Sequence, residues 1–224
     1  MKRIPSWTPL AFAVSLLVAC GGGDDSTTER GAVLSAQLLG KATIAQIDAG
    51  TAASGLQPLS GAAQCDVDLR YVTYMTRDPG GAPASATAGV LVPSGTAAAC
   101  NGERPVVLYA HGTTMTQTKN LAIVSSDSEG SLLMAMYAAQ GFIVVAPNYL
   151  GHDRSSLGYH PYLHAEGQAA DMVDGLRAAR THLAAASATK ASAQLLVTGY
   201  SQGGHVAMAT HKGIERDHSA EFTV

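Results

Sequence analysis

Short apolar runs recur along the second half of the chain, and segments of helical length separate them. Residues 105–112, 142–147 and 195–197 form continuous apolar runs, as expected for strands buried on both faces. Residues 131–140 lie between the first two runs, and residues 163–183, with apolar positions at helical spacing, lie between the last two. Strands that alternate with helices predict a mainly parallel sheet with right-handed crossovers and helices on both faces, the α/β class.

The first third of the chain has a different pattern. Residues 67–76 alternate and are rich in β-branched and aromatic residues, which predicts a strand. A turn cluster at 78–83 and a second predicted strand at 86–92 follow, which together suggest an antiparallel hairpin at the sheet edge. Residues 31–60 show no firm period, and we expect them to wrap the domain edge, with a short helix around residues 32–39.

The N-terminus has the pattern of an export signal. Residues 1–3 carry positive charge, and residues 10–19 form an apolar run that is too short to span a bilayer comfortably. The run ends in Leu-Val-Ala-Cys20, which resembles the lipobox of bacterial lipoproteins. This predicts a signal peptide at 1–19 and a lipid anchor on Cys20; the alternative is an ordinary secretory signal with an incidental cysteine.

Three regions are therefore expected: the signal peptide, a small, polar and acidic tether at 20–30, and a folded domain at 31–224. The predicted location is the bacterial cell envelope, with membrane contact through the anchor. Lipidation of Cys20 leaves Cys65 and Cys100 as an even pair, and in an oxidising compartment they are a candidate disulfide. The alternative for this pair is two unpaired buried thiols.

Composition excludes several classes of protein. Hydrophobic residues make up 46% and charged residues 14%, typical of a globular domain, and a net charge of -3 does not favour nucleic acid as a partner. The eight histidines are scattered, and neither a zinc-binding H-E-x-x-H nor a paired C-x-x-C occurs. Neither a dinucleotide-type G-x-G-x-x-G after a strand nor a P-loop occurs, so we expect no metal and no cofactor.

The chemistry is concentrated in one short segment. The run at 195–197 leads into Gly199-Tyr200-Ser201-Gln202-Gly203, and an alanine-containing segment of helical character follows. In the order strand, sharp turn and helix, G-x-S-x-G is the nucleophile elbow of serine hydrolases. The glycines are needed because the crowded turn leaves no room for side chains beside the serine. Ser201 is therefore the predicted nucleophile, placed where the helix N-terminus favours negative charge.

Two backbone N–H groups are candidates for the oxyanion hole. The N–H of Gln202, directly after the nucleophile, is the first. The second should come from the loop His111-Gly-Thr-Thr114 after the first central strand, with Thr113 the most favoured donor. We expect the His111 side chain to be structural, and Tyr200 and the Gln202 side chain to shape the pocket without transferring protons.

Three ordered motifs, Ala146–Gly151, His160–His164 and Gly199–Gly204, resemble the secretory lipase family of α/β-hydrolases. The chain is more loosely similar to prolyl-oligopeptidase-like serine hydrolases. The resemblance runs from about Arg70 to the end of the chain. It implies the α/β-hydrolase fold, hydrolysis of small-molecule or lipid carboxylic esters, and a triad completed by an Asp and a His downstream of the serine. Asn148 departs from the family, whose members usually carry Asp there.

The remaining triad residues are not evident in the sequence. Only 23 residues follow Ser201 (224 − 201), and His205 and His211 among them should lie on a helix that leads away from it. His152, His160 and His164 precede the serine and are expected at the pocket wall or surface. We therefore expect a hydrolase truncated after the nucleophile helix. The alternatives are a serine peptidase of the same fold and a catalytically inactive surface lipoprotein.

Overall fold

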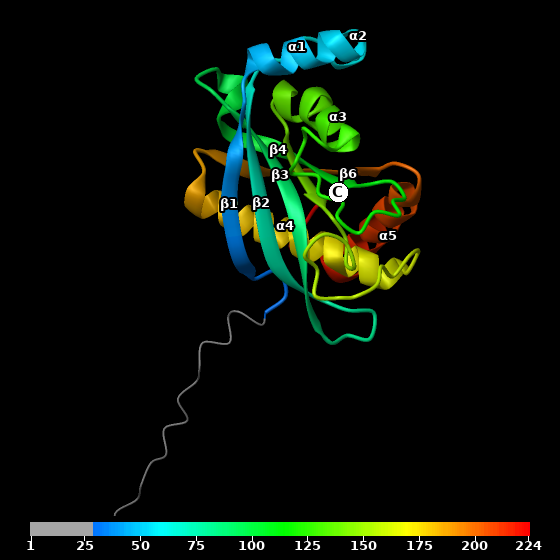
Figure 1. Cartoon of the computed structure of the whole chain (residues 1–224). Helices are drawn as coiled ribbons and strands as arrows, with labels where there is room; N and C mark the ends of the chain where they lie inside the picture. The colour runs from blue at the N-terminus through cyan, green and yellow to red at the C-terminus, as the bar shows by residue number, and fades with distance from the viewer. Residues whose placement is uncertain (1–28) are drawn as a thin grey trace, which may run out of the picture.

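The computed structural model describes residues 29–224, so the predicted signal peptide and Cys20, the predicted site of lipidation, lie outside the described residues. The described chain forms one six-stranded sheet in the order β1-β2-β3-β5-β4-β6 (Figure 1). The strands are β1 (Val33–Ala42), β2 (Asp66–Arg77), β3 (Pro83–Ser94), β4 (Gly102–Ala110), β5 (Ile143–Pro147) and β6 (Thr189–Gly199).

The sheet has an antiparallel part and a parallel part. The antiparallel pairs are β1 with β2, β2 with β3, and β3 with β5. β4 lies between β5 and β6 and is parallel to both. The expectation that residues 195–197 are buried on both faces is wrong, because β6 lies at an edge of the sheet and Leu196 is 48% exposed. The three apolar runs nevertheless form β4, β5 and β6, and the crossovers between them contain the predicted helices. The α/β prediction is therefore confirmed.

One expected element is wrong. Residues 32–39 are not a helix, because β1 pairs antiparallel with β2 from Val33 opposite Tyr74 to Ala42 opposite Val67. This pairing also means that the β2–β3 hairpin does not form the edge of the sheet, which β1 occupies. The helix of this region begins later, where Thr43 and Gln46 form a capping box at the start of α1 (Ile44–Ser54).

Helices cover both faces of the sheet. On one face, α4 (Ala165–Ala186) and α5 (Gln202–Asp217) pack on a core that includes Val106 and Leu108. On the other, α1 and α3 (Ser128–Met136) pack on a core that includes Val107 and Tyr109. Alternate residues of β4 therefore enter opposite cores, as the period of a strand requires. The short helices are α2 (Gln57–Ser60), η2 (Ala98–Cys100) and η3 (Ala138–Gln140). None of the helices in residues 29–224 combines the length and apolar character needed to cross a membrane.

The predicted disulfide is confirmed. Cys65 and Cys100 are bonded, with an S–S distance of 2.00 Å and a Cα–Cα distance of 5.4 Å. Both cysteines are fully buried. Cys65 directly precedes β2, and Cys100 ends η2, shortly before β4. The bond therefore closes a loop that contains the whole β2–β3 hairpin.

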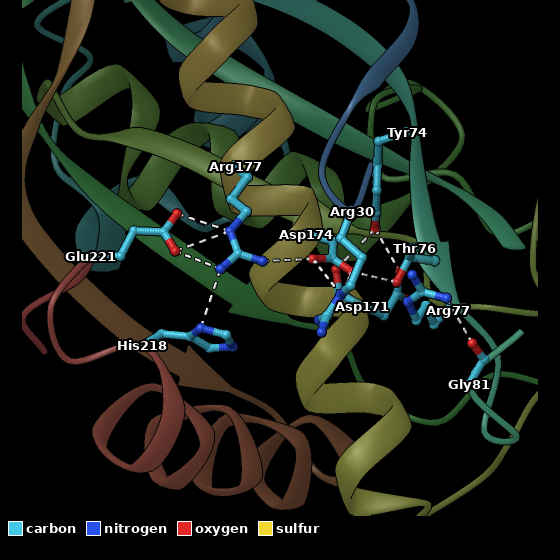
Figure 2. A network of polar contacts seen from close by, with 10 residues as sticks. All are labelled: Arg30, Tyr74, Thr76, Arg77, Gly81, Asp171, Asp174, Arg177, His218 and Glu221. Atoms are coloured by element: carbon cyan, nitrogen blue, oxygen red, sulfur yellow. Dashed lines mark hydrogen bonds and ion pairs between the residues drawn. The ribbon is translucent and has the colours of Figure 1, made fainter. Parts of the chain in front are cut away.

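A polar network connects both ends of the described chain to α4 (Figure 2). The fully buried carboxylate of Asp174 accepts hydrogen bonds from Thr76 Oγ1 at 2.8 Å and Arg30 Nε at 3.0 Å. Arg177 donates to Asp174 at 3.0 Å and, through Nε, to Glu221 at 2.9 Å. Because Asp174 is paired with two cations, its burial is electrostatically compensated.

Asp171, one turn earlier on α4, pairs with no cation among residues 29–224. Its carboxylate accepts hydrogen bonds from Tyr74 Oη at 2.9 Å and from the backbone N–H of Leu150 at 3.0 Å. Burial raises the pKa of Asp171 to about 7, and the nearby carboxylate of Asp174 contributes to this increase. The hydrogen bonds from Tyr74 and Leu150 act in the opposite direction and lower this pKa. The bond to Leu150 joins α4 to the loop that follows β5.

Candidate active site

Ser201 occupies a sharp turn between β6 and α5. Its φ of 55° and ψ of -117° are unusual for a residue other than glycine and indicate a strained backbone. A Cβ atom added to Gly199 would lie 2.3 Å from Gly203 O, and one added to Gly203 would lie 1.9 Å from Ala110 O. Both glycines of the motif are therefore required by contact with the backbone of the same turn and of β4.

The backbone N–H groups at the start of α5 are only partly used. Gly203 N donates to Tyr200 O at 2.7 Å and Gly204 N donates to Ser201 O at 2.9 Å. Within residues 29–224, neither the N–H of Gln202 nor the hydroxyl of the exposed Ser201 makes a hydrogen bond. The N–H of Gln202 is thus available at the end of the helix that favours an anion.

The loop after β4 lies against this turn. Tyr200 N donates to Ala110 O at 3.2 Å, and a Cβ atom added to Gly112 would lie 2.8 Å from Cδ1 of Tyr200. Thr113 follows Gly112 and is exposed. Its N–H has no hydrogen-bond acceptor in the described part of the chain. The structure therefore brings the two N–H groups predicted for the oxyanion hole to neighbouring segments.

The side chain of His111 is buried behind this loop. Its ring stacks on Tyr149 with a centroid distance of 3.9 Å, and its two nitrogens lie 2.7 Å from Gly112 O and 3.2 Å from Asn148 O. Desolvation lowers the pKa of His111, against the two carbonyl contacts that raise it. These contacts agree with the structural role expected for this side chain.

Three histidines that precede the serine have distinct places. His160 Nδ1 lies 2.8 Å from Leu150 O and therefore carries the proton, which leaves Nε2 to accept a hydrogen bond from Gln202 Nε2 at 2.7 Å. The His152 ring lies 4.5 Å from the His160 ring, and burial, with the neighbouring histidines, lowers the pKa of His152 to about 4. His164 instead caps α4 by accepting from Gly167 N. No pattern in the sequence predicts the contact between His160 and Gln202.

His152 and His160 line a cavity of about 510 Å³ beside the loop that follows β4. The other lining residues are Thr113, Thr114, Met115, Gln117, Gly151 and Tyr162. A slightly larger hollow of about 630 Å³ along β6 includes none of the residues of the elbow. In residues 29–224, no group of three His, Cys, Asp or Glu side chains is arranged to hold a metal ion.

The amide at position 148 has a local explanation. Asn148 is fully buried, its Oδ1 accepts from Leu121 N at 2.9 Å, and its Nδ2 donates to Thr87 Oγ1 at 2.9 Å. The Thr87 hydroxyl donates its one proton to Asp153 Oδ2 at 2.8 Å. It must therefore accept from residue 148, and an amide can donate this bond whereas an ionised carboxylate cannot.

Comparison with solved structures supports the same fold. The rice cell wall degrading esterase LipA from Xanthomonas oryzae superposes with a TM-score of 0.76 at 36% identity, over 86% of this chain and 48% of that one. This chain has the α/β-hydrolase fold. A putative hydrolase from Legionella pneumophila superposes with a TM-score of 0.76 at 24% identity, over 86% of this chain and 50% of that one.

Candida antarctica lipase A is a more distant example of the fold, with a TM-score of 0.53 at 16% identity, over 89% of this chain and 43% of that one. This chain thus spans about half the length of the Xanthomonas and Legionella structures. No protein-family model and no curated protein matches it.

Proposed function

We propose that this protein hydrolyses carboxylic esters through an acyl-enzyme formed on Ser201. The observation that carries the proposal is the strained turn that holds Ser201 at the N-terminus of α5, between two glycines that the backbone contacts require. This strand–turn–helix arrangement exposes the serine hydroxyl beside an unused backbone N–H.

In the proposed reaction, Ser201 Oγ attacks the acyl carbon of the ester and loses its proton to a general base. The negative charge that develops on the carbonyl oxygen is stabilised by the N–H groups of Gln202 and Thr113, each worth about 3–4 kcal/mol in comparable sites. The alcohol leaves with a proton, and water then releases the acid and restores Ser201. No histidine in residues 29–224 hydrogen-bonds to the Ser201 hydroxyl, and none of them is therefore assigned as the general base.

The proposed substrate is a small-molecule or lipid ester. The cavity beside Thr113 combines the exposed Met115 and Tyr162 with the polar rings of His152 and His160, and can accept an apolar group close to the oxyanion donors. The similarity to an esterase at 36% identity supports this substrate class.

We also propose that residues 1–19 direct export and that Cys20 anchors the hydrolase domain, residues 31–224, to the cell envelope. The disulfide between Cys65 and Cys100 supports an oxidising compartment, because such bonds are rare where thiols are kept reduced.

The proposal is tested by p-nitrophenyl butyrate turnover of the full chain and of its Ser201→Ala variant. We expect the variant to lose turnover, whereas Ser54→Ala, on the distant helix α1, should retain it. Undiminished turnover in Ser201→Ala would remove this serine from the mechanism. Absence of turnover in the unaltered chain would favour an inactive scaffold.

A further inference from the structure

Glu129, in the first turn of α3, reaches the oxyanion loop. Its Oε1 accepts a hydrogen bond from the backbone N–H of Gly112 at 3.0 Å and another from Tyr109 Oη at 2.7 Å. Its Oε2 accepts from Lys119 Nζ at 3.1 Å. The N–H of Gly112 is therefore occupied, whereas the N–H of the next residue, Thr113, has no acceptor within residues 29–224.

The carboxylate is held in its ionised form. Burial alone would raise the pKa of Glu129, but the hydrogen bonds from Gly112, Tyr109 and Lys119 lower it below its usual range. Lys119 is mostly buried and also pairs with Asp127 at 2.8 Å, so one cation is shared by two carboxylates.

The two peptides that flank the Cα atom of Gly112 are each fixed by one contact. The one that continues the chain joins Gly112 to Thr113. Its carbonyl oxygen, Gly112 O, lies 2.7 Å from His111 Nδ1, and the preceding peptide is fixed by the bond from Gly112 N to Glu129. In a trans peptide the C=O and N–H point in opposite directions. Because the carbonyl points to the buried ring of His111, the N–H of Thr113 points away from it.

We propose that Glu129 is a positioning residue that sets the direction of the Thr113 N–H in the oxyanion hole. The inference rests on the proposed esterase function, since the Thr113 donor acts only when a carbonyl oxygen becomes negative. Oxyanion donors act on the transition state far more than on the bound substrate, so misalignment of one lowers kcat and leaves KM nearly unchanged.

The first measurement is the kinetics of Glu129→Ala and Glu129→Gln on p-nitrophenyl butyrate. We expect kcat of Glu129→Ala to fall about 10- to 100-fold, which is less than removal of a donor typically costs, with KM within about twofold. Glu129→Gln retains an oxygen that can accept from Gly112 and should recover most of this loss. Glu103→Ala, an exposed glutamate on β4, is the matched control and should behave as the unaltered protein.

The second measurement does not depend on turnover. Backbone amide exchange, followed by NMR, should show a slow N–H at Gly112 in the unaltered protein and a faster one in Glu129→Ala, with β4 and α5 unchanged. Unchanged exchange at Gly112, or equal kcat in Glu129→Ala, would overturn the positioning role. Failure of the esterase function would appear differently, as full turnover in Ser201→Ala or none in the unaltered protein, and the exchange result would still decide whether Glu129 holds the loop.

Discussion

The buried carboxyl group of Asp171 should make the stability of this protein fall as pH rises through the neutral range. The pKa of an aspartate in the unfolded chain is about 3.8, and burial raises that of Asp171 to about 7 in the folded protein. Between these values the folded state binds more protons than the unfolded state. The free energy of unfolding therefore decreases as pH rises from about 4 to about 7, and this loss is complete above pH 7.

The size of the effect follows from the same two pKa values. Each pKa unit corresponds to about 1.4 kcal/mol, and the interval of about 3 units gives at most about 4 kcal/mol. Asp171→Asn removes the titration and nearly preserves the shape. The amide oxygen can accept from Leu150 N, and the amide nitrogen can donate to Tyr74 Oη, where the carboxylate now accepts.

The assay is urea unfolding of both proteins from pH 4 to pH 8, monitored by circular dichroism. The free energy of unfolding of the unaltered protein minus that of Asp171→Asn should fall by up to about 4 kcal/mol between pH 4 and pH 7 and then level off. Taking this difference cancels the titration of the groups that do not interact with Asp171. A difference that is constant with pH, or that rises, would refute the reasoning.

Two further predictions concern the covalent and steric construction of the fold. Reduction of the Cys65–Cys100 bond should lower the free energy of unfolding by about 4 kcal/mol, since the bond closes a loop with a sequence separation of 35. Urea denaturation with and without reductant measures this loss, and a loss below about 1 kcal/mol would contradict the prediction. Gly203→Ala should destabilise the protein and abolish turnover because its Cβ would lie 1.9 Å from Ala110 O, whereas Gly204→Ala, with no atom within 4 Å, should be tolerated. Equal melting temperatures of the two variants would show that the turn can relax.

Most of the strands that the sequence predicted are either buried on both faces or alternate between buried and exposed residues. β4 and β5 are recognisable because strands covered by helices on both faces are continuously apolar. β6 was also recognised from its apolar run, although it lies at an edge of the sheet with Leu195 buried and Leu196 exposed. β1 is not recognisable in the sequence, because Leu38 and Leu39 of this edge strand are exposed and its apolar residues show no clear period. Its conformation depends on its pairing with β2.

For the candidate site, the sequence by itself determined the local turn. Gly199, Ser201 and Gly203 lie within five residues, and the contact that excludes a side chain at Gly199 is with Gly203 of the same turn. The contact that excludes a side chain at Gly203 is with Ala110 of β4. Only the tertiary structure decided which distant groups surround it. Glu129 meets Gly112, and His160 meets Gln202 across 42 residues, because separate helices and loops converge at the ends of the parallel strands. These contacts depend on the direction of individual hydrogen bonds, which no periodicity in the sequence records.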